Sequence, residues 1–443
     1  MILFIQKNLI FLGLGLAQLF VYFWLYFYAF QTSQDYRLIP TFLLTLSGIF
    51  TLYFFSLFCL QKEKSSRTSL LLSILAFGFL FRLICFFMPA LLSDDIFYYI
   101  WHGRVSAAGL NPYLFTPASP ELAFLRDFQI WQPLPFKEIP PAYPPLVMST
   151  FWLSYWIGGS SLLGFKLLLW IPEILMCFYG IKLLQLHQKS TAWILIYAWC
   201  PLPILEYMGM GHSDVWGIAF LCAFLFYFLR EKIPQAFIFL ALATLVKWIP
   251  LLFIPLLWRY MNGGKRAIAF LAFSLTLILM YLPFLSAGKN VFGLLPTYLK
   301  SWEFNASIYR FIRLGFERAD YSHIIVSGFI ALWALLVAIR KPPLLKGLLA
   351  ITLFFFLFFH TVYPWYLGWL LPFLLIEKLW AGYAWLYTCF LSYFILMIYR
   401  TQGLWQENSW VLGMEYVPVF LLLVLQWILQ KDPPVIFSKK ISN

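Results

Sequence analysis

Two adjacent carboxylates, Asp94 and Asp95, are the side chains of this sequence best placed for acid–base chemistry. They follow an apolar run and open the stretch 93–113, which reads SDDIFYYIWHGRVSAAGLNPY. Ser93 or Asp94 could cap a helix that begins here, but a cap needs only one such residue and leaves Asp95 unexplained. The functional hypothesis is a general base, Asp94, held in place by its neighbour Asp95. Whether the pair also binds a divalent metal ion is left open.

A second polar group, Gly211-His-Ser-Asp214, stands at the start of an apolar run, shortly after Glu206. Capping of the following helix would explain Ser213 or Asp214. It does not explain His212 and Glu206, because ionisable side chains within a membrane segment are energetically unfavourable and usually face a cavity. These two residues therefore join the candidate site.

Cations suited to a phosphate group occur in two places. Lys247 lies inside an apolar stretch, within Lys247-Trp-Ile-Pro250, and reads as a fixed positive charge in a polar cavity. The alternative is a lysine that extends to the membrane interface. Arg310 and Arg313 lie close together with Arg318, and guanidinium groups match phosphate oxygens.

The composition defines the broad class. Of the 443 residues, 63% are hydrophobic and 11% are charged, and the mean hydropathy is +0.82, which is more apolar than a soluble domain needs. The net charge of +13 comes from basic residues that punctuate apolar runs, so nucleic acid is not an expected partner. The alternating pattern of a membrane β-barrel is absent. The sequence predicts an all-α polytopic membrane protein.

The predicted architecture is one integral membrane domain over residues 1–443, with 12 or 13 transmembrane helices of about 20 residues each. An interfacial helix is expected over 93–108. Residues 146–157 are too short to cross the bilayer and predict a half-helix. Residues 234–258, interrupted at Lys247, predict a re-entrant hairpin. The predicted full spans are 8–30, 40–61, 68–91, 161–186, 191–208, 214–230, 267–286, 323–340, 345–360, 364–377, 381–399 and 411–430.

Basic residues in short loops and tails predict the orientation, because such segments stay cytoplasmic. Both termini are then cytoplasmic, and the location is the inner or plasma membrane. The long loops 92–145 and 287–322 share the outer face with segment 211–214. One orientation therefore places every candidate site on one side. The basic residues that carry this prediction include Lys62, Lys64, Arg67, Arg230, Lys232, Arg340, Lys341, Lys439 and Lys440.

At these residues the chain resembles a known family. The pattern S-D-D-x-x-x-Y-x-W-x-G-R-x-x-x-x-G-x-N-P-Y, followed by Tyr143-Pro-Pro-Leu146, is similar to the first outer loop of bacterial and archaeal polyprenyl-phosphate-mannose-dependent mannosyltransferases of the GT-C superfamily. The resemblance covers most of residues 80–375 and implies a GT-C type bundle. Further motifs follow in the family's order: Cys200-Pro-Leu, Glu206, Gly209-Met-Gly-His-Ser-Asp214, Lys247-Trp-Ile-Pro250 and Tyr363-Pro-Trp-Tyr366.

The sequence departs from the family at Tyr98 and His102, where relatives commonly carry Arg and Asp. The loss of one basic and one acidic residue together could remove a structural ion pair. It could equally mark a different sugar or acceptor.

The resemblance implies an inverting transferase that moves a sugar, with mannose expected, from a polyprenyl-phosphate donor to a glycan or lipid acceptor. Nucleotide sugars are cytoplasmic, whereas the acidic pair is expected outside, so the donor must arrive through the bilayer. Asp94 or Asp95 would take the acceptor proton, and Lys247, Arg310 and Arg313 would stabilise the leaving phosphate. No cofactor is required. Candidate substrate-binding residues are Arg104, Asn111, Tyr143, Glu206, His212, Asp214, Trp302, Tyr363 and Trp365.

Two other classes compete with this hypothesis. A secondary transporter or lipid-linked sugar flippase would also explain charges within the membrane, but transporters usually show paired interrupted helices in two related halves, with sites near the midplane. A structural assembly subunit without chemistry would leave Asp95, His212 and Lys247 unexplained. Aromatic residues of the outer loops are most often interfacial anchors, which is the alternative for Trp302, Tyr363 and Trp365.

Overall fold

The computed structural model describes residues 2–62, 68–316 and 318–429. The described residues form helices and connecting loops and no β-strand, although an isolated parallel bridge joins Phe304 and Thr361. The all-α class predicted from the composition is therefore confirmed. Lys64, Arg67, Lys439 and Lys440, which served the orientation argument, lie outside the described residues.

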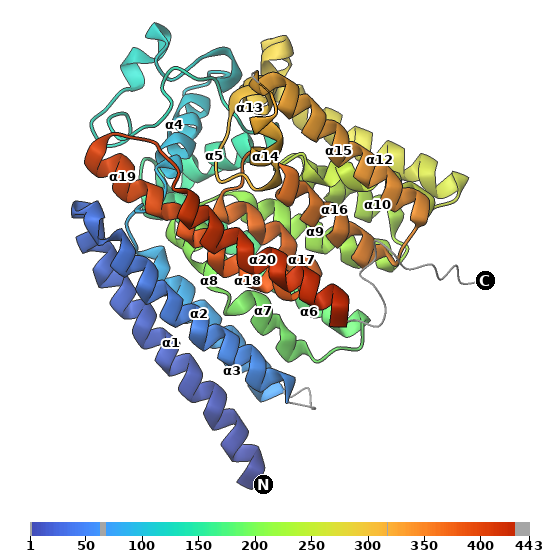
Figure 1. Ribbon diagram of the computed structural model, residues 1–443. Helices are drawn as coiled ribbons and strands as arrows, with labels where there is room; N and C mark the ends of the chain where they lie inside the picture. The colour runs from blue at the N-terminus through green and yellow to red at the C-terminus, as the bar shows by residue number, and fades with distance from the viewer. Residues whose placement is uncertain (1, 63–67, 317, 430–443) are drawn as a thin grey trace. The chain divides into compact units, whose positions relative to one another are not determined.

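The chain forms two compact units, and each is described by itself. The first unit contains residues 1–248 and 269–296. In it α1, α2 and α3 lie side by side, and α6 packs against α9, which packs against α10 (Figure 1). Its helices are α1 (Ile2–Gln34), α2 (Ile39–Gln61), α3 (Thr68–Phe86), α4 (Asp95–Ala107), α5 (Pro145–Gly158), α6 (Leu162–Leu186), α7 (Leu195–Ala198), α8 (Pro201–Pro203), α9 (Asp214–Leu229) and α10 (Ile233–Thr244).

The second unit contains residues 249–268 and 297–443. In it α15 packs against α16, and α18 packs against α20. Two helices, α12 (Gly263–Tyr281) and α13 (Leu295–Ser301), contain residues of both units. The remaining helices are α11 (Ile254–Arg259), α14 (Ile308–Leu314), α15 (Ala319–Arg340), α16 (Leu344–Phe358), α17 (Leu371–Leu374), α18 (Trp380–Thr388), α19 (Phe394–Gln402) and α20 (Ser409–Leu429).

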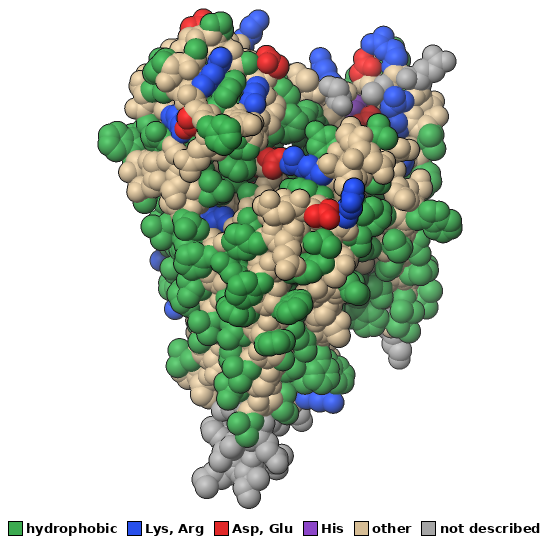
Figure 2. All heavy atoms as spheres, turned by 90° about the vertical axis from the view of Figure 1, so that its left-hand side faces the viewer, with side chains coloured by type: hydrophobic (Ala, Val, Ile, Leu, Met, Phe, Trp, Pro, Cys, Tyr) green, Lys and Arg blue, Asp and Glu red, His purple; other side chains and the backbone are tan. Residues whose placement is uncertain are grey.

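Eight helical segments of the described chain are long and apolar enough to cross a membrane. Hydrophobic side chains cover much of the face drawn in Figure 2, as expected for a surface in contact with lipid. Along α1 these exposed residues include Phe20, Phe23, Trp24 and Phe27. Four further apolar helices are shorter: Asp214–Leu229, Ile233–Thr244, Ile249–Arg259 and Leu344–Phe358.

Two of the predicted spans are not continuous helices. The segment 191–208 is divided into short turns that end in a π-helix, Ile204–Gly209, and 364–377 begins with a 3₁₀-helix, Pro364–Leu370, followed by the short α17. Pro201 and Pro203 interrupt the first segment, because proline lacks the N–H that an α-helix uses. The sequence-based count of 12 or 13 crossings included both segments.

The other predicted breaks are present. The half-helix near 146–157 is α5, whose 14 residues correspond to about 21 Å. Residues 234–258 are not one straight helix, since α10 ends at Thr244 and the next helical turn begins at Ile249. The helix expected over 93–108 is α4.

Ionisable residues in the long helices of the first unit pair with other helices. The guanidinium of Arg82 in α3 donates to Glu173 Oε2 in α6 at 2.7 Å and to the carbonyl of Ala198. Tyr197 donates to the same Glu173 oxygen. Lys166 of α6 donates to the carbonyl of Met88 at 2.8 Å. These bonds tie α3 to α6 because a buried charge is tolerated only when it is paired.

Candidate active site

The acidic pair stands at the start of α4. The hydroxyl of Ser93 accepts the backbone N–H of Asp95 at 3.2 Å, whereas Asp94, at the N-cap position, makes no side-chain cap hydrogen bond. Helix capping therefore does not account for either carboxylate. The Asp95 side chain keeps 25% of its surface exposed, so a substrate can reach it.

The surroundings of Asp95 change its acidity. Burial raises the pKa of Asp95 to about 7, with further contributions from the neighbouring carboxylates Asp94 and Asp214. The hydroxyl of Tyr99, which donates to Asp95 Oδ2 at 3.3 Å, and the cation of Lys247 act in the opposite direction on this pKa. A carboxyl that titrates near neutrality is suited to act as a general base.

Tyr99 is the buried hydrogen-bond donor to the Asp95 carboxyl. It is fully buried, and its ring stacks on Phe151 of α5 with centroids 4.7 Å apart. Its hydroxyl lies 2.9 Å from the hydroxyl of Tyr143. Helices α4 and α5 approach closely because Gly103 has no side chain, and a Cβ there would lie 2.3 Å from the Phe151 carbonyl oxygen.

The segment 211–214 lies against α4. Gly211 has a φ of +87°, which glycine adopts readily, and a Cβ there would lie 2.8 Å from Ile96. This approach places His212 Nδ1 3.9 Å from Asp95 Oδ2 and 3.3 Å from the Tyr99 hydroxyl. On its other side, His212 Nε2 is 3.5 Å from Glu206 Oε2. The α4 cluster is Asp95, Tyr99, Tyr143, His212 and Glu206.

Lys247 and Asp214 form an ion pair of 2.6 Å in the first unit. The side chain of Asp214 is 2% exposed, whereas that of Lys247 is 19% exposed. Both influence the pKa of Asp95, so the pair lies within electrostatic reach of the α4 cluster. Lys247 lies in the non-helical segment between α10 and Ile249, and this position leaves its cation near the candidate base.

Two of the residues predicted to bind substrate, Arg104 and Asn111, make hydrogen bonds within the chain. Arg104 donates to Asp127, to the Leu125 carbonyl and to Ser160, and it is 7% exposed. Asn111 accepts the backbone N–H of Tyr113 and donates to the hydroxyl of Ser286 at 2.9 Å. These bonds give both side chains the task of ordering loop 92–145.

Tyr98 and His102 contact each other. They are four residues apart in α4, and their rings meet edge to face with centroids 4.3 Å apart. Burial lowers the pKa of His102 to about 3, so its ring is neutral. An aromatic contact therefore joins the two positions at which the sequence departs from the family pattern, and both explanations of the departure stay open.

The arginines of the second unit contact carboxylates. Arg310 bonds Glu407 at 3.0 Å, and Arg313 lies 3.4 Å from Glu303. Their side chains remain 43% and 32% exposed, respectively. The pairing of Arg310 with Glu407 could not be read from the sequence, because the two residues are 97 positions apart and pairing at that separation leaves no local pattern.

The aromatic residues expected to contact the substrate stack on one another in the second unit. The ring of Tyr363 lies between Phe304 and Trp365, with centroid distances of 4.6 and 4.4 Å. The indole N–H of Trp302 donates to the Tyr363 hydroxyl at 3.1 Å. Trp365 is 5% exposed, which makes it a packing residue more than an open platform.

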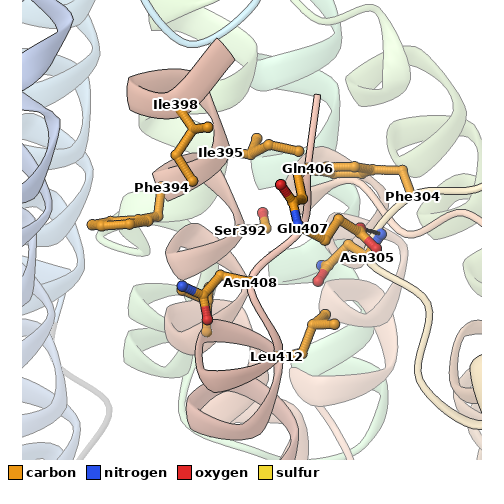
Figure 3. Close-up of a pocket in the computed structure, with 11 residues that line it drawn as sticks. Phe304, Asn305, Ser392, Phe394, Ile395, Ile398, Gln406, Glu407, Asn408 and Leu412 are labelled. Atoms are coloured by element: carbon orange, nitrogen blue, oxygen red, sulfur yellow. Dashed lines mark hydrogen bonds between the residues drawn. The ribbon is translucent and has the colours of Figure 1, made fainter. Parts of the chain in front are cut away.

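A small pocket of about 20 Å³ lies beside Glu407 and Asn408 in the second unit (Figure 3). This volume suits a single water and not a sugar. Asn305 lines the pocket and is 1% exposed. The sequon Asn305-Ala-Ser307 is thus buried, and a glycan could not be attached to the folded chain there.

Within residues 2–62, 68–316 and 318–429, no three His, Cys, Asp or Glu side chains gather in a way that could hold a metal ion. Asp94 and Asp95 alone would supply only the carboxylates of two adjacent residues. The residue that sequence reasoning missed in this site is Tyr99, whose signal was its position one helical turn after Asp95.

The helices and the buried polar cluster together describe a polytopic membrane protein with a candidate acid–base site. A family model, "Alpha-(1->6)-mannopyranosyltransferase, N-terminal domain" of the MptA/B family, matches residues 22–262, more than half of the chain. The chain belongs to this family, and it is an integral membrane glycosyltransferase of the mannosyl-transferring kind. This assignment confirms the resemblance seen in the sequence. No curated protein matches the chain significantly.

Proposed function

We propose that this GT-C type protein transfers mannose from a polyprenyl-phosphate donor to a glycan or glycolipid acceptor, with inversion at the anomeric carbon. The observation that carries the proposal is the Asp95 carboxyl, which titrates near neutrality beside the Lys247–Asp214 pair. Both lie in the part of the chain that the mannosyltransferase family covers. The family also favours a transferase over the transporter or flippase alternative.

Asp95 acts as the general base in this proposal, with Asp94 raising its pKa. This order is the reverse of the one expected from the sequence. Asp95 takes the acceptor hydroxyl proton while the hydroxyl oxygen attacks the anomeric carbon. The bond from that carbon to the donor phosphate breaks, and the phosphate leaves with the electron pair.

Lys247 stabilises the departing phosphate, because a fixed cation favours the state in which negative charge develops. Its side chain is 19% exposed and therefore accessible to the donor. A phosphate role for Arg310 and Arg313 stays a prediction, and each would exchange its glutamate for the phosphate.

The donor is proposed to reach the site through the bilayer, with the reaction on the outer face and both termini in the cytoplasm. A reporter fused near Pro120 or Ala319 should then read external, and one fused after Lys440 should read cytoplasmic. An external reading for the fusion after Lys440 would overturn the outer-face assignment.

The direct test incubates purified protein in lipid nanodiscs with polyprenyl-phosphate mannose, polyprenyl-phosphate glucose or a nucleotide-activated mannose, together with a mannoside acceptor. Transfer from polyprenyl-phosphate mannose alone is expected, with the α configuration from a β-linked donor. Transfer from the nucleotide sugar, or retention of configuration, would overturn the donor or the inverting mechanism. The same assay with a chelator measures any dependence on a divalent metal ion.

A further inference from the structure

A row of three polar side chains leads inward from Asp95. Tyr99, His212 and Glu206 are each 0% exposed. The Tyr99 hydroxyl lies 3.3 Å from Asp95 Oδ2 and 3.3 Å from His212 Nδ1, and His212 Nε2 lies 3.5 Å from Glu206 Oε2. Each group therefore contacts the next, and the row ends at the proposed base.

The number of hydrogens that these side chains carry determines which group donates and which accepts at each contact of the row. Burial raises the pKa of Tyr99 well above its ordinary value, so its hydroxyl keeps its single hydrogen. Because an ionised Asp95 can only accept, Tyr99 donates that hydrogen to Asp95 and must itself accept from its other neighbours. His212 then presents an N–H at Nδ1 to the Tyr99 oxygen.

The same reasoning fixes the far end. Burial holds the pKa of His212 well below its ordinary value, so the ring is neutral and carries one hydrogen. With that hydrogen at Nδ1, Nε2 is an acceptor that faces Glu206 Oε2. With Nε2 as an acceptor, the favourable partner across this 3.5 Å contact is a hydrogen carried by the Glu206 carboxyl.

We propose that Glu206 and His212 are positioning residues that direct the Tyr99 hydroxyl hydrogen onto Asp95 and leave the other Asp95 oxygen for the acceptor. This inference rests on the proposed function and differs from the sequence-based assignment of Glu206 and His212 to substrate binding. Hydrogen bonds that all point one way strengthen one another in a buried site.

Local structure supports this task. Glu206 belongs to the π-helix Ile204–Gly209, a form that often marks functional sites. The backbone N–H of His212 donates to the Glu206 carbonyl at 3.0 Å, which fixes the two residues relative to each other. The charged groups that face Asp95 from other elements are Asp214 of α9 and Lys247 after α10, with Asp94 beside it.

The test compares Glu206→Gln, Glu206→Leu and Tyr99→Phe in the transfer assay over pH 5 to 9. Gln keeps an N–H for His212, so Glu206→Gln should stay within about threefold of the wild-type kcat, whereas Glu206→Leu should lose about tenfold, the equivalent of one hydrogen bond. Tyr99→Phe should lose a similar factor and move the acid limb of the rate profile to higher pH. Tyr98→Phe is the matched control and should leave the limb in place, because its hydroxyl bonds the Pro140 carbonyl.

KM for donor and acceptor should be unchanged in all four variants. A Glu206→Gln protein as slow as Glu206→Leu would overturn the inference, since an ionised carboxylate would then be required. A large rise in KM would also overturn it, because Glu206 would be a substrate ligand. Asp95→Asn distinguishes failure of this inference from failure of the proposed function. If Asp95→Asn transfers mannose at the wild-type rate, Asp95 is not the base and the proposed function is wrong.

Discussion

The Lys247–Asp214 pair of the first unit and the Arg310–Glu407 pair of the second differ in how much water reaches them. In the first unit, Asp214 is 2% exposed beside Lys247, and Tyr99, His212 and Glu206 of the α4 cluster are fully buried. In the second, Arg310 and Glu407 are 43% and 24% exposed. Exposed pairs contribute about 0.2–1 kcal/mol, whereas removal of one partner from a buried pair costs about 3–5 kcal/mol.

This difference separates groups that are held from groups that can exchange partners. A buried network of charges lowers stability relative to apolar packing. We therefore attribute the network near Asp95 to a functional role. The exposed bonds of Arg310 and Arg313 to their glutamates contribute little stability, so we expect these arginines to be able to exchange the glutamates for a phosphate. The predictions below test this contrast.

The largest effect is expected for Asp95→Asn. Asn keeps the shape and can still accept the Tyr99 hydrogen bond, so the protein should fold and bind donor. It cannot accept the acceptor proton, and loss of a general base lowers kcat by about 10²–10⁴-fold. Single-turnover transfer and donor binding measure the two properties separately. Near-normal turnover would reduce the cluster to a structural feature.

Lys247→Met should lower kcat by about 10²–10³-fold through loss of leaving-group stabilisation. It should also destabilise the protein, because Asp214 is left buried without this partner. The double variant Lys247→Met, Asp214→Leu is the control: it should recover thermal stability and remain inactive. Recovery of activity together with stability would show that Lys247 is only structural.

The pH dependence should have opposite signs for activity and stability. The pKa of Asp95 is near 3.9 in the unfolded chain and is raised to about 7 in the fold. Between these values the folded protein holds a proton that the unfolded chain has released, so stability should fall as pH rises from about 4 to about 7. Activity should rise with pH through about 7 as the base ionises. Thermal unfolding of Asp95→Asn should lack this pH dependence.

Asp94→Asn sharpens the assignment within the pair. Removal of the neighbouring charge should lower the pKa of Asp95, because Asp94 contributes to raising it. The acid limb of the rate profile should move to lower pH, with a loss in kcat of about tenfold or less. If Asp94→Asn instead abolishes turnover and Asp95→Asn does not, Asp94 is the base.

The smallest effect is expected for Arg310→Gln. Loss of its exposed bond to Glu407 should change the free energy of unfolding by about 1 kcal/mol or less. KM for the polyprenyl-phosphate donor should rise while KM for the acceptor stays constant. A strong loss of stability would contradict the contrast drawn between the two units.

Local patterns predicted the helices and singled out the candidate residues, whereas the contacts of those residues depend on the tertiary structure. The carboxylates at 94–95, the glycine before His212 and the break at Lys247 are all readable from neighbouring residues. The contact of Arg104 with Asp127 could not be predicted, because nothing nearby in the sequence shows that Asp127 accepts its hydrogen bond. The proposed order of Asp94 and Asp95 could not be read from the sequence, because it depends on which of the two carboxyl groups is buried in the folded chain.

The bond between Arg82 and Glu173 also bears on how the protein is made. The two residues are 91 positions apart, so at about 5–20 residues per second the ribosome delivers Glu173 about 5–18 seconds after Arg82. During that interval α3 carries a cation within a membrane segment without the carboxylate that later neutralises it, a penalty of up to about 3 kcal/mol at insertion. We therefore expect α3 to become fully stable in the membrane only after α6 is inserted, so the order of synthesis bears on how the fold forms.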